Sequence, residues 1–154
     1  MKKSRKKYEK PVRRWDKERI EKEKELLKKF GLRRKKEIWR AEALVRKFRR
    51  LARKLIASPN KEEEKILIKK LASLGILKED ANVNDVLRLN VEDILKRRLQ
   101  TIVAEKGLAN TIKQARQLIV HGKVKIGERK VVYPSYLVRV DEEDKIQVEG
   151  LQKK

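Results

Sequence analysis

At 154 residues, 44% of them charged and 5% aromatic, the chain can hold one ordinary domain or two small ones, but a large apolar core is not expected. Lys and Arg outnumber Asp and Glu by 45 to 23, and the resulting formal charge of +22 disfavours a compact monomer unless a polyanion such as nucleic acid neutralises it. With no Cys and one His, the sequence excludes disulfides, thiolate zinc sites and His-based metal clusters.

The N-terminal third carries most of the excess charge. Residues 1–56 hold 25 Lys and Arg against 8 acids, a net charge of +17, whereas the net charge is −1 over residues 57–92 and +6 over residues 93–154. Residues 1–15 are predicted to form a basic N-terminal extension, because they are cationic and poor in core-forming side chains. An anionic membrane surface is the rival partner, but no run approaches the roughly 20 apolar residues of a spanning helix, so we expect no membrane association.

A helical basic region is predicted over residues 16–92. Asp16 is placed to cap a helix that ends before Gly31. A second helix, from about Arg34 to Ala57, has apolar residues at three- and four-residue spacing along one face. Its other face carries cations with almost no acids to balance them, which favours phosphate binding over a merely solvated face. These cations are Arg46, Arg49, Arg50, Arg53 and Lys54.

More helical segments are predicted in the middle of the chain. Asn60 resembles the start of a capping box for a helix that ends near Gly75. Residues 82–90 are interpreted as a connector with room for a short helical turn at Asp85–Leu89. A single helix is then expected over residues 90–107, where apolar side chains recur at helical spacing up to a terminal glycine.

Residues 93–150 are predicted to form a small domain of two helices packed on a short, largely antiparallel sheet, followed by a tail at 151–154. Thr111 caps the second of these helices, which ends at Gly122. Beyond that glycine the apolar period changes from about four to two, which predicts short strands. Their expected positions are Val124–Ile126, Leu137–Val140 and Ile146–Val148, with turns at 127–128 and 142–144. Taken together, these elements indicate an α+β fold.

The polar face of the helix over residues 112–121 is the strongest candidate for a binding site. It presents amides and cations without carboxylates, and basic residues continue onto the next hairpin, which suits the phosphate, ribose and base edges of RNA. The candidate residues are Lys113, Gln114, Arg116, Gln117 and His121 on the helix, and Lys123, Lys125, Arg129 and Lys130 on the hairpin. The alternative is an ordinary solvated helix face, with His121 compensating the dipole at the helix end.

Two arginines on the preceding helix, Arg97 and Arg98, are further candidates. Arg98 lies at the edge of the apolar stripe of its helix, between the positions that face the core and those that face solvent. It is therefore either a core-edge side chain or a phosphate clamp beside the polar helix. The sequence alone leaves both interpretations open.

Signatures of an enzyme are absent from the sequence. There is no Gly-rich phosphate loop, no metalloprotease motif and no Ser or Cys nucleophile beside a base. Paired carboxylates occur only in solvated helical segments and in one turn. We therefore expect no enzymatic activity, no cofactor, no bound metal and no small-molecule substrate.

Residues 93–148 resemble the RNA-binding module called the S4 domain. The resemblance is carried by LKRRLQTIV, GLANTIKQARQLIVHGKVKIG, PSYLV and DKIQV. Together with EIWRAEALVRKFRRLARKLIA upstream, it extends to nearly the whole chain, which is similar to the small-subunit ribosomal protein S4 family. Bacterial members of that family often carry an N-terminal Cys-rich zinc site. Its absence here makes this chain resemble the archaeal-type form, or the closely related eukaryotic type without a long basic tail.

The resemblance implies a structural constituent of the small ribosomal subunit in the cytoplasm. It implies a primary rRNA-binding protein that nucleates assembly of the 30S body and contributes to translational accuracy. Its partners would be 16S-type rRNA and neighbouring small-subunit proteins, with mRNA near the channel by which it enters as a further contact. The RNA-contact positions carried over are Arg97, Arg98, Thr111, Lys113, Gln114, Arg116, Gln117, His121, Lys123 and Lys130; Thr111 joins because a helix N-terminus binds anions.

Three other functions are alternatives to a ribosomal role. A stand-alone S4-domain heat-shock or ribosome-rescue factor would not need the strongly basic helical half. An enzyme that carries the module, such as a pseudouridine synthase or a tRNA synthetase, would need a catalytic constellation in the fewer than a hundred remaining residues. A generic basic chromatin or membrane-surface protein would not need an ordered helix and hairpin surface.

Overall fold

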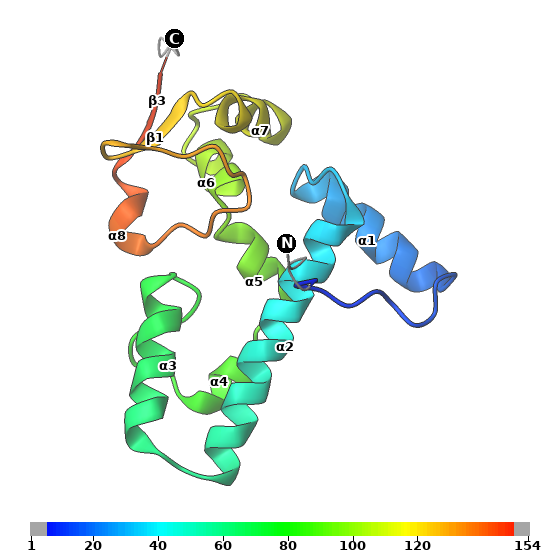
Figure 1. Cartoon of the computed structure of the whole chain (residues 1–154), viewed down its shortest axis with the longest axis vertical. Helices are drawn as coiled ribbons and strands as arrows, with labels where there is room; N and C mark the ends of the chain where they lie inside the picture. Colours follow the sequence, from blue (N-terminus) through cyan, green and yellow to red (C-terminus); the bar gives the residue numbers. More distant parts are fainter. Residues whose placement is uncertain (1–5, 150–154) are drawn as a thin grey trace, which may run out of the picture.

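Helix α2 (Lys35–Ala57), 23 residues long, is the spine of the N-terminal region in the computed structural model, which describes residues 6–149. In Figure 1 it runs between α1 on one side and α3 and α4 on the other. The other helices of this region are α1 (Lys17–Lys29), α3 (Lys61–Ser73), α4 (Val83–Leu87) and α5 (Val91–Lys96). None of the helices within residues 6–149 combines the length and the apolar character needed to cross a bilayer.

The apolar face of α2 is buried, as its spacing predicts. The buried α2 residues are Ile38, Ala41, Val45, Phe48, Ala52 and Leu55. They belong to one cluster with Leu71 from α3, Val86 from α4 and Leu95 from α5. Each such side chain contributes about 1.5–3 kcal/mol when it leaves water, so this cluster holds the short helices against the spine.

Most of the predicted helix ends in this region are confirmed. Asp16 caps α1 and Asn60 caps α3, each by accepting a hydrogen bond from a backbone N–H of the first turn. The short helical turn expected at Asp85–Leu89 is present as α4 but begins and ends two residues earlier, because a capping box between Asn82 and Asp85 starts it. Polar caps of this kind satisfy N–H groups that have no partner inside the helix.

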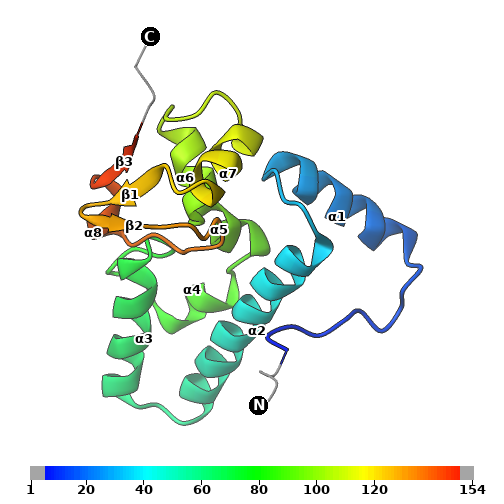
Figure 2. The ribbon, with the colours of Figure 1, turned by 45° about the horizontal axis from the view of Figure 1, so that its top comes forward.

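The C-terminal region is the predicted small domain of helices and a short sheet. Its helices are α6 (Leu99–Glu105), α7 (Ile112–Val120) and α8 (Val140–Glu143), and its strands are β1 (Val124–Ile126), β2 (Arg129–Lys130) and β3 (Ile146–Val148). The sheet is antiparallel with the order β2-β1-β3. In Figures 1 and 2, α6 and α7 lie on one side of these strands. The α+β class predicted from the sequence is confirmed.

The single helix expected over residues 90–107 is wrong, because α5 and α6 are separate helices. Arg98 has an extended backbone between them, with φ −74° and ψ 141°. It forms an antiparallel bridge with Leu137, and the N–H of Leu99 donates to the carbonyl of Tyr136 at 2.8 Å. Backbone pairing with a distant segment therefore interrupts a stretch whose local pattern is helical throughout.

The second of the three expected strands is also wrong. Besides β3, the strand that pairs with β1 is β2, which comes directly after a tight turn at Gly127, where φ is +59°. The stretch expected to be that strand, Leu137–Val140, instead bridges to Arg98 at its start and enters α8 at its end. Residues 142–144, expected to form a turn, lie at the end of α8.

Two buried apolar clusters divide the chain close to the break between α5 and α6. The first cluster ends at Leu95 and the second begins at Leu99. In α7 the second cluster buries Ala115 and Ile119. The domain limits predicted at 15, 92 and 150 stay predictions. The tail at 151–154, together with residues 1–5, lies outside the described residues.

Candidate nucleic-acid interface

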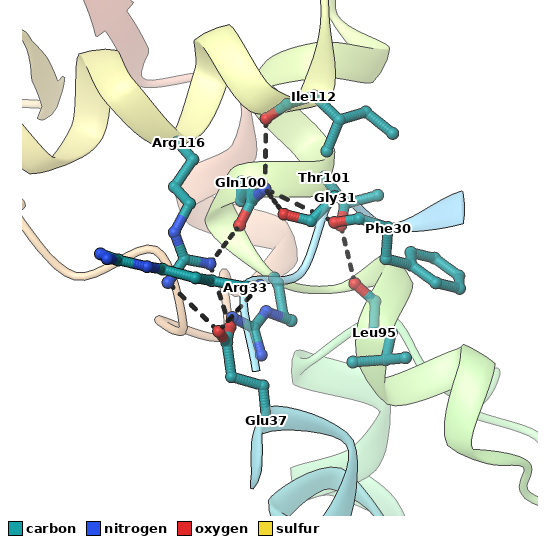
Figure 3. A network of polar contacts seen from close by, with 10 residues as sticks. Phe30, Gly31, Arg33, Glu37, Leu95, Gln100, Thr101, Ile112 and Arg116 are labelled. Carbon is teal, nitrogen blue, oxygen red and sulfur yellow. Dashed lines mark hydrogen bonds and ion pairs between the residues drawn. The ribbon is translucent and has the colours of Figure 1, made fainter. Parts of the chain in front are cut away.

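The carboxylate of Glu37 forms ion pairs with two arginines of the C-terminal domain, and Figure 3 shows it facing one of them, Arg116. Glu37 is in the first turns of α2. Its Oε2 is 2.5 Å from Nη2 of Arg98, and Arg116 reaches both of its oxygens at 3.1 and 3.2 Å. The Arg98 side chain is 6% exposed and that of Glu37 is 14% exposed, so the charges compensate each other away from water. We call Glu37, Arg98 and Arg116 the arginine clamp.

Gln100 extends the clamp into the contact between the two regions. Its Nε2 donates to the carbonyl of Gly31 at 2.9 Å and to the carbonyl of Ile112 at 3.1 Å, and its Oε1 accepts from Arg116 at 3.3 Å. Figure 3 shows this amide between the α1–α2 loop and α7. A Cβ at Gly31 would lie 2.6 Å from Ile112 Cγ2, so only glycine allows this approach. These polar contacts fix how the C-terminal domain sits on the helical region.

Burial and charge in the clamp shift the pKa of its carboxyl group and of one of its guanidinium groups. Burial raises the pKa of Glu37, but the hydrogen bond from Arg116 and the charges of both arginines outweigh it, so the pKa lies below its usual value. Burial lowers the pKa of Arg98, and Glu37 opposes this. A guanidinium stays protonated in proteins, so the clamp is an ion triad at neutral pH.

The clamp should make the stability of the protein fall in acid. A carboxyl whose pKa is lowered by folding stabilises the folded state above its unfolded pKa, about 4.3 for Glu, and loses this contribution as the pH falls through the folded value. We expect the free energy of unfolding to decrease from about pH 5 downward. Urea unfolding between pH 7 and pH 3 measures this. A Glu37→Gln variant should be less stable at pH 7 and show a shallower acid decrease; an identical slope would contradict the prediction.

Several residues predicted to contact RNA have partners within the protein, and their RNA contacts stay predictions. Arg98 and Arg116 belong to the clamp, and the buried position of Arg98 is that of a core-edge side chain. Arg97 donates to the carbonyl of Val138 at 3.2 Å and pairs with Glu143 at 2.9 Å. Their common role in the structure is to hold elements together.

The two predicted residues at the start of α7 act as caps. Thr111 accepts a hydrogen bond from the N–H of Gln114 at 3.1 Å. The Oε1 of Gln114 in turn accepts from the N–H of Asn110 at 2.9 Å. The first of these bonds confirms the cap predicted at Thr111, and both place the two side chains beside the first turn of the helix.

The rest of the predicted surface of the C-terminal domain is open to solvent. Lys125 pairs with Glu149, and Arg129 donates to the hydroxyl of Tyr136 at 2.9 Å, so two of the cations on the hairpin have partners. The remaining five form no side-chain hydrogen bond or ion pair with other residues of the described part. They are Lys113, Gln117, His121, Lys123 and Lys130, all exposed, and we call them the α7 surface.

A second cationic surface lies on the outer side of α2. Arg46, Arg50, Arg53 and Lys54 are exposed there, as predicted. Arg49 differs, because it is half-buried and its Nη2 donates to the carbonyl of Leu89 at 2.6 Å. We call the exposed set the α2 surface. Its three arginines also line a groove of about 530 Å³, to which Lys6 and Lys7 of the N-terminal extension contribute.

Beside the clamp lies a basic pocket that the sequence interpretation did not include. It has a volume of about 350 Å³ and is lined by the clamp, by Pro134 and Ser135, and by Arg33, Arg34, Lys36 and Arg40. The last four are exposed cations at the start of α2 and in the loop before it. The run RRKK at residues 33–36 was the available signal. The pocket adds exposed cations beside the clamp, which can bind a polyanion by its phosphates.

Comparisons with known proteins agree with this architecture. The family model described as the S4 domain matches residues 97–144. A small ribosomal subunit protein uS4 from Saccharolobus islandicus is 55% identical over 149 residues, which cover 94% of this chain and 82% of that protein. The protein of the same name from Saccharolobus solfataricus is also 55% identical with the same coverage, and that from Korarchaeum cryptofilum is 49% identical over 96% of this chain and 90% of its own length. The chain therefore belongs to the uS4 family of small ribosomal subunit proteins.

Proposed function

We propose that this protein is a structural constituent of the small ribosomal subunit that binds 16S-type rRNA directly. The observation that carries the proposal is the identity of about half of all residues to proteins named for that subunit, over nearly the whole chain. The role is structural, so the absence of a catalytic constellation from the sequence is consistent with it.

The geometry supports a primary rRNA-binding role. The α2 surface and the α7 surface come from different regions, yet the arginine clamp holds those regions together before any RNA is bound. A preformed arrangement avoids part of the entropy loss of binding, because fewer groups must be ordered at that step. This suits a protein that binds early and nucleates assembly of the 30S body.

Three finer parts of the proposal follow from the family. In the assembled subunit the protein contacts neighbouring small-subunit proteins and lies near mRNA. It contributes to translational accuracy from that position. Its place of action is the cytoplasm, where the subunit works.

The stand-alone factor is not favoured as a second function. A heat-shock or rescue factor shares the S4 domain, which in this chain is the match at residues 97–144. The similarity to the uS4 proteins extends over 94% of the chain and therefore includes the basic helical half. A stand-alone heat-shock or rescue factor would not need that basic helical half.

Co-sedimentation with ribosomal subunits tests the proposed function. A tagged copy of the chain, expressed in an archaeal host with a related ribosome, is expected in the small-subunit fraction of a sucrose gradient. It should stay there after a high-salt wash that removes loosely bound proteins. Recovery only in the free-protein fraction would contradict the proposal.

The α7 surface should contribute to RNA affinity without contributing to stability. We expect Lys113→Ala combined with Gln117→Ala to weaken binding to a folded rRNA fragment, because both exposed side chains have no partner among the described residues. The melting temperature should change little, since surface substitutions usually stay within about 0.5 kcal/mol. Anisotropy of labelled RNA and thermal unfolding measure the two effects. Arg116→Ala, one position away, should instead lower the melting temperature; equal stability of all these variants would contradict the assignment.

A further inference from the structure

The N-terminal extension presents an indole to solvent. Trp15 is 90% exposed, and Val12 in the same extension is 99% exposed. Among residues 6–149, no side chain hydrogen-bonds the Trp15 indole. Trp39, the second tryptophan, is half-buried and donates its Nε1 to Glu23 at 2.9 Å. A large amphipathic ring left in water indicates a partner that covers it.

The chain on both sides of Trp15 is anchored, so the ring is held at a defined place. On one side, the ring of Tyr8 packs on Trp39 of α2 with centroids 5.8 Å apart. On the other side, Asp16 follows Trp15 directly and caps α1. In Figures 1 and 2 the segment between these anchors leaves the side of α2 and loops out to the start of α1. The extension therefore presents the indole from a short tethered loop.

The charges around Trp15 decide which partner fits. Four cations surround it in sequence, Lys10, Arg13, Arg14 and Lys17, and all are exposed. The adjacent acid, Asp16, accepts from a backbone N–H at the helix start and is occupied there. An aromatic ring between cations matches a nucleotide, whose base offers a π-face and whose phosphates offer negative charge. A typical protein surface would have to supply compensating acids around an apolar contact.

We propose that Trp15 stacks on an unpaired base of the rRNA, with Arg13 and Arg14 on the neighbouring phosphates. This inference rests on the proposed rRNA binding and adds a third contact region to the α2 and α7 surfaces. Stacking on an aromatic side chain tolerates any base, so the contact depends on an unpaired nucleotide at this position and hardly on its identity.

Binding to a folded fragment of small-subunit rRNA, followed by anisotropy of the labelled RNA, tests the stacking. Trp15→Ala is expected to weaken affinity by about 5- to 150-fold, the range that loss of one stacked base produces. Trp15→Phe should keep most of the affinity, whereas Trp15→Leu, apolar but without a π-face, should lose about as much as Trp15→Ala. Val12→Ala is the matched control, equally exposed in the same extension, and should leave affinity unchanged.

Two further readouts separate stacking from other roles. Trp15→Ala should leave the salt dependence of binding unchanged, because a stacked ring releases no counterions, whereas Arg14→Ala should reduce the slope by roughly 0.7–0.9. The emission of Trp15, obtained as the difference between the wild type and Trp15→Phe, should be quenched at RNA saturation. Thermal unfolding of each variant checks that the fold is kept. The quenching is measured at RNA saturation, so it does not depend on how tightly a variant binds.

The outcomes distinguish this inference from the function on which it rests. If the wild type binds the RNA but Trp15 emission and the affinity of Trp15→Ala are unchanged, the stacking is wrong and the exposed indole faces a protein neighbour. If the wild type does not bind the RNA, the proposed function fails and takes the inference with it. Quenching together with the loss in Trp15→Ala and retention in Trp15→Phe supports the stacking.

Discussion

Replacing Glu37 by Ala is expected to lower the free energy of unfolding by about 3–5 kcal/mol, the usual loss when a buried ion pair loses one partner. The substitution leaves Arg98 and Arg116 side by side with no carboxylate between them. Arg98, at 5% exposure, cannot recover its hydration. Urea unfolding at neutral pH measures the change, which corresponds to a drop in melting temperature of about 2–4 °C per kcal/mol for a chain of this size.

Glu42 is the matched control for this prediction. It is a half-buried glutamate on the same helix, and burial raises its pKa, with Arg46 opposing the rise. It forms no hydrogen bond or ion pair with another residue of the described part, so Glu42→Ala should cost far less than Glu37→Ala. Similar losses in the two variants would show that the clamp contributes no more than ordinary helix burial.

The second large effect is expected from the α2 surface. Removing three of its charges together, Arg50→Ala, Arg53→Ala and Lys54→Ala, should weaken binding to a folded rRNA fragment by roughly a hundredfold near 0.1 M salt. It should also reduce the slope of log affinity against log salt by roughly two to three, because each phosphate contact contributes about 0.7–0.9. Titrations of labelled RNA at several salt concentrations give both values.

Three lysines of α3 provide the control for charge itself. Lys65, Lys69 and Lys70 are exposed, but they lie on a helix whose first turn carries three glutamates. Substituting all three by Ala removes the same charge from the protein as the α2 variant does. The salt slope should change little, and equal reductions in both triple variants would mean that binding depends on net charge rather than on the α2 surface.

Local patterns predicted those parts of the fold that local forces determine. The helix spacing of α2 identified its buried face, and the caps at Asp16, Asn60 and Thr111 located three helix starts. The break at Arg98 could not be predicted in this way, because its cause is backbone pairing with Leu137, 39 residues further along the chain. The strand β2 was missed for a different reason: it follows the predicted turn at Gly127 directly, but its two exposed residues lack the apolar alternation by which strands were identified.

The same distinction explains the candidate site. A sequence pattern shows which cations lie on a polar face, but it does not show which of them meet an acid from another element. Arg98 and Arg116 find their partner 61 and 79 residues away, on α2. Exposed cations such as Lys113 and Lys123 were placed correctly, because their surroundings depend only on their own helix and hairpin. The pocket at residues 33–40 could not be predicted in this way, because its walls come from both the helical region and the C-terminal domain.

A comparison of the affinity for two polyanions at matched salt tests most directly whether this protein recognises small-subunit rRNA. The chain is titrated into a labelled, folded fragment from the 5′ region of small-subunit rRNA and into a random DNA duplex of equal charge. We expect clearly tighter binding to the rRNA fragment and a steep fall in affinity with salt. The reason is that a fixed arrangement of cations and polar groups recognises RNA shape as well as charge. Equal affinity for the two at every salt concentration would show that the protein binds polyanions by charge alone, and would contradict the proposed recognition of rRNA.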